Sequence, residues 1–75
     1  MDKNFLKTVS EYTGLDIGDI GPDVLLAHYC YDLDLAEMAF WLESDYGIEI
    51  PNEMLEGPLT VGELWDYIAV GTKHE

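Results

Sequence analysis

Residues 32–51 read DLDLAEMAFWLESDYGIEIP, and this stretch determines the fold that the rest of the chain completes. Its first fifteen residues contain neither glycine nor proline, and apolar residues recur in them at helical spacing. That apolar stripe consists of Leu35, Met38, Ala39, Leu42 and Tyr46. Aspartates at positions 32 and 34 suit a helix N-terminus, and Gly47 favours a helix end. The pattern predicts a helix over residues 32–46 with one side in a hydrophobic core.

The same helix carries a second apolar row on its opposite side. This row consists of Leu33, Ala36, Phe40 and the polar Ser44, and it is flanked by Glu37 and Glu43. An outer side that is both apolar and acidic is typical of a protein-binding surface. The alternative is that a loop simply covers Leu33 and Phe40, and we favour the binding surface. Trp41 lies between the two sides, where it either shields the core edge or anchors a partner.

Before this helix, the chain predicts one further helix and a long loop. Phe5, Leu6, Val9 and Tyr12 share a helical face, Asp2 precedes them as a candidate cap and Gly14 follows as a stop. Residues 15–31 contain two glycines, a proline and three aspartates, which is typical of a loop. We expect its apolar residues Ile17, Ile20 and 24–26 to anchor it.

After this helix, the chain predicts two shorter elements. Pro51 favours extended backbone before it, and residues 52–55 are predicted to form one short helical turn. Residues 60–63 read TVGE, a capping box for a last helix that ends before Gly71. Its expected inward residues are Val61, Leu64, Trp65 and Ile68. The predicted fold is all-α: a small four-helix bundle with a long first loop and a short third helix, as a single domain over residues 1–75.

The charge of the chain restricts its partners. It has 16 acidic residues, 3 lysines and no arginine, for a formal net charge of −13. No basic surface is available to neutralise phosphates, which excludes direct binding to nucleic acid or to an anionic membrane. A basic protein surface is instead favoured as a partner. One cysteine excludes an internal disulfide, and the first residues lack the apolar run of a signal peptide, so we expect a cytoplasmic monomer.

Catalytic and metal-binding patterns are weaker. Cys30 follows His28 by two residues and is a conceivable nucleophile, but the aspartates at 32 and 34 oppose a thiolate, so we favour a small loop-filling residue. Asp32, Asp34 and Glu37 are a conceivable weak site for a hard cation, although capping and solvation explain them more simply. One cysteine and two histidines are too few for a zinc site. We therefore predict no enzyme, no catalytic residue and no metal.

The order and spacing of these features resemble those of acyl carrier proteins. The matching residues are Leu33-Asp34-x-x-Glu37, then Leu42-Glu43-x-x-Tyr46-Gly47-Ile48-Glu49-Ile50-Pro51, and, without gaps, Thr60-Val61 and Leu64-x-x-Tyr67-Ile68. The resemblance covers roughly residues 30–70. It implies that family's four-helix bundle. It also implies the family's role, which is to hold acyl intermediates of fatty-acid or polyketide-type biosynthesis on a phosphopantetheine arm and present them to partner enzymes.

The resemblance also locates a departure from the family. The arm is attached to the serine of an Asp-Ser-Leu motif at the start of the second helix, and the matching positions here are Tyr31-Asp32-Leu33. A carboxylate cannot form the phosphodiester that a hydroxyl forms, so we expect no arm and no cofactor. Shifting the alignment by one residue would place Leu33 or Tyr31 at the site. Natural divergence and an engineered substitution both remain open, and the additional change at Tyr31 favours divergence.

We therefore predict an acyl-carrier-protein-like domain that lacks the arm and docks its acidic second helix on a basic partner enzyme. The predicted face consists of Asp32, Leu33, Ala36, Glu37, Phe40 and Glu43. The alternative is a working acyl carrier. In that case either another residue bears the phosphopantetheine, or Asp32 is an engineered replacement of the attachment serine. A third possibility is an acidic mimic of nucleic acid that occupies a basic groove, and the ordered motifs weigh against it.

Overall fold

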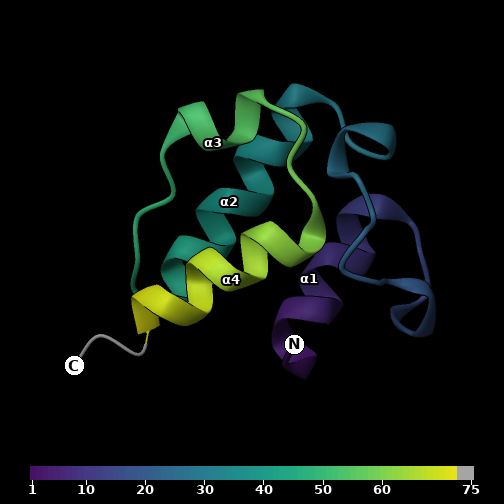
Figure 1. The fold of residues 1–75 in the computed structure, drawn as a ribbon, viewed down its shortest axis with the longest axis horizontal. Helices are drawn as coiled ribbons and strands as arrows, with labels where there is room; N and C mark the ends of the chain where they lie inside the picture. Colours follow the sequence, from purple (N-terminus) through teal and green to yellow (C-terminus); the bar gives the residue numbers. More distant parts are fainter. Residues whose placement is uncertain (73–75) are drawn as a thin grey trace.

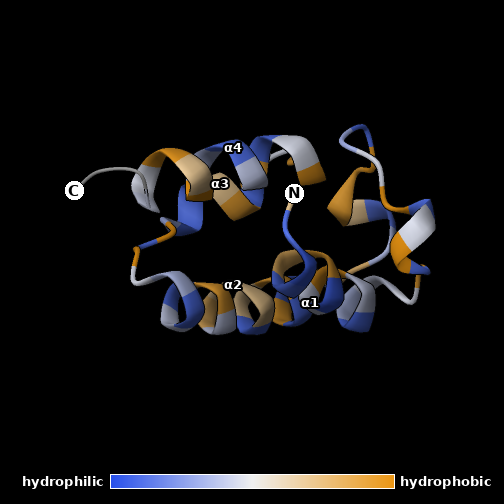
Figure 2. Cartoon of the chain, turned by 90° about the horizontal axis from the view of Figure 1, so that it is seen from below, coloured by the Kyte–Doolittle hydropathy of each residue, from blue (hydrophilic) through white to orange (hydrophobic). Residues whose placement is uncertain are grey.

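A computed structural model of the chain describes residues 1–72. Within these residues the helices are α1 (Lys3–Thr13), α2 (Asp32–Tyr46), α3 (Asn52–Glu56) and α4 (Val61–Thr72). The connection from α1 to α2 contains two 3₁₀ turns and runs along one side of the bundle (Figure 1). In Figure 2, α1 and α2 form one layer and α3 and α4 form the other. The described residues therefore confirm the all-α fold with a long first loop and a short third helix.

The ends of α1 and α2 follow from local sequence chemistry. The Asp2 carboxylate accepts a hydrogen bond from the Phe5 backbone N–H at 2.9 Å, which confirms the predicted cap. Gly14 and Gly47 end their helices with φ angles of +78° and +66°, a conformation that favours glycine. The Tyr46 hydroxyl donates to the same Asp2 carboxylate oxygen at 2.7 Å. This contact ties the end of α2 to the beginning of α1.

The core lies between the two layers. The α2 stripe is buried there except for Tyr46, which is half-buried. The other helices contribute Phe5 and Val9 from α1 and Val61, Leu64 and Ile68 from α4. The Trp65 ring centroid lies 5.0 Å from that of Phe5 and 6.2 Å from that of Tyr46. Trp65 is thus a packing residue, as predicted.

The long loop is held against the start of α4. Ile20 and Leu26 are buried as expected, whereas Ile17 is 42% exposed, so the prediction that Ile17 anchors the loop was wrong. Ile17 begins a short 3₁₀ turn at the outer edge of the loop, where its side chain meets solvent. The Gly62 and Val61 N–H groups donate to backbone oxygens of the loop at 3.0 and 2.9 Å. The loop carbonyls thereby satisfy N–H groups that a helix start leaves free.

Gly71 differs from its predicted position. It lies inside α4, which continues to Thr72, and not after the helix. A Cβ at Gly71 would lie 3.0 Å from the Ile48 side chain, so the missing side chain lets the last turn of α4 pass close to the α2–α3 connection. Glycine here serves a tertiary contact and does not end the helix.

We expect Gly62→Ala to destabilise the fold by about 1–2 kcal/mol, because overpacking outweighs the gain in helix propensity. A Cβ at Gly62 would lie 2.8 Å from the Pro22 Cβ and 3.0 Å from the Pro22 carbonyl oxygen. Urea unfolding measures the change. Gly57→Ala is the control, since its Cβ would meet nothing within 4 Å. Equal stabilities of the two variants would contradict the packing of the loop on α4.

Candidate functional site

The start of α2 is organised by Asp34. Tyr31 is the cap residue in extended conformation, and its N–H donates to the Asp34 carboxylate at 3.2 Å. Asp32 is the first residue of the helix and is exposed. Of the two aspartates expected to cap the helix, Asp34 makes the capping contact. The Asp32 carboxylate stands in solvent at the helix N-terminus.

The residues at this position do not fit a phosphopantetheine group, which is attached through a hydroxyl oxygen. The first three residues of α2 are Asp32, Leu33 and Asp34, and none has a hydroxyl. The nearest hydroxyls along the sequence are the phenols of Tyr29 and Tyr31, which precede the helix and are 47% and 85% exposed. The chemistry available at the helix start is that of a carboxylate beside exposed aromatic and aliphatic side chains.

The outer row of α2 is open to solvent. Leu33 is 84% and Phe40 is 60% exposed, and Ala36 and Glu37 are exposed as well. Figure 2 places this helix in the layer opposite α3 and α4. The alternative that the long loop covers Leu33 and Phe40 was therefore wrong. Exposed apolar side chains of this size on one helix are a feature of interaction surfaces.

Glu43 has a different environment from the rest of the predicted face. It is half-buried, and its carboxylate accepts a hydrogen bond from the Ile50 backbone N–H at 2.7 Å. Glu43 therefore holds the connection between α2 and α3 in place. It lies at the edge of the face with one carboxylate oxygen already engaged.

Trp41 is an exposed aromatic that the predicted face left out. It is 49% exposed, and its ring meets the Phe40 ring edge-on, with centroids 5.5 Å apart and an interplanar angle of 73°. On the facing helix, Tyr12 is half-buried. Burial and, second, the neighbouring Glu37 carboxylate raise the pKa of the Tyr12 phenol. Tyr12 and Glu37 therefore lie close together at the junction of α1 and α2.

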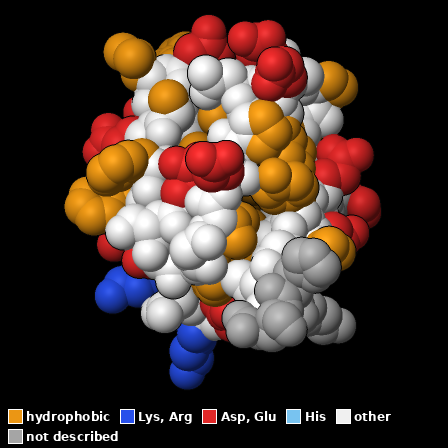
Figure 3. Space-filling view, turned by 90° about the vertical axis from the view of Figure 1, so that its left-hand side faces the viewer, with side chains coloured by type: hydrophobic (Ala, Val, Ile, Leu, Met, Phe, Trp, Pro, Cys, Tyr) orange, Lys and Arg blue, Asp and Glu red, His pale blue; other side chains and the backbone are white. Residues whose placement is uncertain are grey.

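The charged residues of α2 are all acidic. Figure 3 shows one face of the molecule, on which acidic side chains lie among exposed hydrophobic ones and the lysines are confined to one edge. In the part of the chain that the structure describes, both lysines belong to α1. The surface of α2 therefore presents carboxylates and apolar groups to solvent, without a basic residue of its own.

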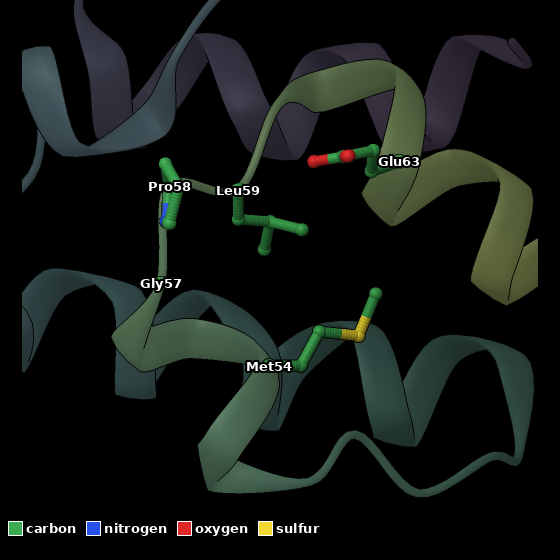
Figure 4. Close-up of a pocket in the computed structure, with 5 residues that line it drawn as sticks. All are labelled: Met54, Gly57, Pro58, Leu59 and Glu63. Atoms are coloured by element: carbon green, nitrogen blue, oxygen red, sulfur yellow. The ribbon is translucent and has the colours of Figure 1, made fainter.

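Shallow grooves border α3. One, of about 330 Å³, runs between α2 and α3 and is lined by Asp32, Leu33, Leu35, Ala36, Asn52, Leu55 and Glu56. Another, of about 410 Å³, lies between α3 and the start of α4, with Met54, Leu59 and Glu63 on its walls (Figure 4). The Glu63 carboxylate accepts a hydrogen bond from the Thr60 backbone N–H at 3.0 Å and therefore forms part of the cap of α4.

The environment of Cys30 indicates a structural role. It is buried, and its thiol donates to the Tyr12 carbonyl oxygen with Sγ and O 3.4 Å apart. Burial, and second the negative charge of Asp34, raise the pKa of the thiol, which disfavours a nucleophilic thiolate. Residues 1–72 contain no group of three side chains suited to a metal ion. None of the helices in this range has the length and hydropathy needed to cross a membrane.

Comparison with known proteins identifies similar sequences. No family model matches the chain. Curated proteins named meromycolate extension acyl carrier protein are similar to it, and that of Mycobacterium leprae (strain TN) is 35% identical over 65 residues, covering 80% of this chain and 54% of the relative. The protein of that name from Mycolicibacterium aurum is 34% identical, covering 80% of this chain and 64% of the relative. The chain thus spans less than two thirds of the length of these relatives.

Proposed function

The chain is related to the acyl carrier protein family by sequence and by fold, and on that basis we propose that it is a carrier-type bundle that works by protein contact without a phosphopantetheine arm. Acyl carrier proteins are carrier proteins and not enzymes, in agreement with the prediction that this chain is no enzyme. The relationship supports a place in fatty-acid-type biosynthesis. The loss of the arm and the docking through α2 go beyond this relationship, and each rests on particular residues.

The absence of the arm rests on Asp32. The resemblance aligns this residue with the attachment serine, and the exposed carboxylate at the start of α2 cannot make the required phosphodiester. Attack by the carboxylate on the phosphate would instead give an acyl phosphate, which is a labile mixed anhydride. Tyr31 also replaces the family's preceding aspartate, so two adjacent positions of the motif have changed together.

The docking role rests on the exposure of the α2 outer row. Burying the side chains of Leu33 and Phe40 in an interface would contribute roughly 1.5–3 kcal/mol each. The carboxylates of Asp32 and Glu37 beside them favour a basic partner and set the association rate and the specificity. The proposed partner is an enzyme with a basic, partly apolar patch, met by a monomer of this chain in the cytoplasm.

A capture experiment tests the docking surface. We expect Glu37→Lys combined with Phe40→Ala to reduce the amount of a basic partner captured from a lysate of the encoding organism by at least about tenfold, because interface energy concentrates in few residues. Quantitative mass spectrometry of the captured proteins measures it. The matched control is Asp66→Lys combined with Val70→Ala, which makes the same kinds of change at exposed positions of α4. Equal capture by wild type and the α2 variant would exclude this face.

A further inference from the structure

The exposed aromatic pair on α2 lies next to a carboxylate. Phe40 and Trp41 make an edge-on contact, and about half of the Trp41 surface remains open to solvent. The Phe40 ring thus covers part of the indole, and the exposed part is available for a further contact. The sequence pattern placed Phe40 in the docking face and left open whether Trp41 shields the core edge or anchors a partner.

Helical spacing places Glu37 beside both rings. Glu37 precedes Phe40 by three residues and Trp41 by four, and side chains at these spacings are neighbours on a helix. The half-buried Tyr12 of α1 is near both Glu37 and Trp41, since each of these side chains influences the pKa of the Tyr12 phenol. A carboxylate, an indole face and a phenol thus meet along the junction of α1 and α2.

We propose that this junction binds an arginine side chain of the partner protein, which stacks on Trp41 and pairs with Glu37. The inference rests on the proposed function, because it specifies the chemistry with which a docking partner meets α2. A guanidinium group is planar and weakly hydrated, so it can stack on a ring and donate two hydrogen bonds to a carboxylate at once. A lysine ammonium is a compact, strongly hydrated charge and satisfies only the carboxylate well.

No residue of this sequence can supply the arginine. This chain contains no arginine, and a second copy would bring the same net charge of −13 to the contact. Self-association through this surface is therefore electrostatically disfavoured, whereas a basic partner is attracted. Charge complementarity thus selects a basic segment as the occupant of the Glu37–Trp41 junction.

The two tryptophans of the chain permit a direct test by NMR. The full chain, labelled with ¹⁵N, is titrated with an acetylated and amidated helical peptide that carries two arginines one turn apart on a leucine-bearing face. Matched peptides replace arginine by lysine or by the uncharged citrulline. We expect the indole N–H signal of Trp41 to shift with saturation, while that of Trp65, packed between Phe5 and Tyr46, stays in place.

The specificity for arginine is the deciding quantity. We expect the arginine peptide to bind about two- to fivefold more tightly than the lysine peptide, as an exposed cation–π contact would give. In Trp41→Leu that ratio should fall to about one, and Glu37→Gln should weaken both cationic peptides while the fold is kept. Equal affinities in the wild type, or an unmoved Trp41 signal, would overturn the inference and leave the docking role in place. Failure of both cationic peptides to bind would also overturn it, and the capture experiment then decides the proposed function separately.

Discussion

The native chain is expected to remain unmodified when it is incubated with coenzyme A and a broad-specificity phosphopantetheinyl transferase, whereas Asp32→Ser should gain one phosphopantetheine group. The substitution supplies the hydroxyl that forms the phosphodiester, at a position that is exposed and begins α2. The expected effect is close to all-or-none, because the carboxylate offers no stable product. Intact mass spectrometry measures it.

Asp32→Ser should not disturb the start of α2. The helix cap is made by Asp34, whose carboxylate accepts the Tyr31 N–H, so Asp32→Ser leaves the capping contact intact. Asp34→Ser is the matched control: it also introduces a serine in the first turn, and we expect it to stay unmodified.

Three outcomes separate the alternatives. Modification of the native chain would show a working carrier and refute the interpretation of Asp32. Modification of Asp32→Ser alone would support a carrier fold whose attachment chemistry was lost at one residue. Modification of Asp32→Ser only in combination with Tyr31→Asp would show that the change at Tyr31 also removed recognition by the transferase.

Much of the helical structure could be predicted because its determinants are local. The bounds of α2 agree with prediction, since no residue within it breaks a helix and Gly47 can adopt the left-handed conformation that ends it. The capping box at the start of α4 is also observed, with the Glu63 N–H donating to the Thr60 hydroxyl oxygen at 3.1 Å. Such contacts span three residues and depend little on the rest of the chain.

The features that could not be predicted depend on contacts distant in sequence. Gly71 resembles a helix end until α4 is seen to pack against Ile48, twenty-three residues earlier in the chain. Glu43 resembles a surface acid, yet its carboxylate binds the Ile50 N–H, because the backbone after Gly47 folds back toward α2. The exposure of Trp41 likewise depends on how α1 packs beside α2, which the periodicity of either helix alone does not determine.

The two sides of α2 should respond in opposite ways to one and the same substitution. Leu42 is fully buried and Leu33 is 84% exposed, although both are leucines of one helix, nine residues apart. We expect Leu42→Ala to reduce the free energy of unfolding by about 3–5 kcal/mol, through lost burial and the cavity that remains. A chain of 75 residues has roughly 4–11 kcal/mol in total, so this variant should be largely unfolded at moderate urea concentrations.

Leu33→Ala is the internal control for this prediction and a test of the docking surface at the same time. Its free energy of unfolding should stay within about 0.5 kcal/mol of the wild type, because the side chain has little contact to lose, whereas partner capture should fall. Urea unfolding followed by circular dichroism measures the first effect, and the capture experiment measures the second. A loss of stability in Leu33→Ala comparable with that of Leu42→Ala would mean that the outer row is packed in solution, and the docking surface would then have to be abandoned. A stable Leu33→Ala with reduced capture separates the two roles of α2: its inner stripe holds the bundle together, and its outer row serves a partner.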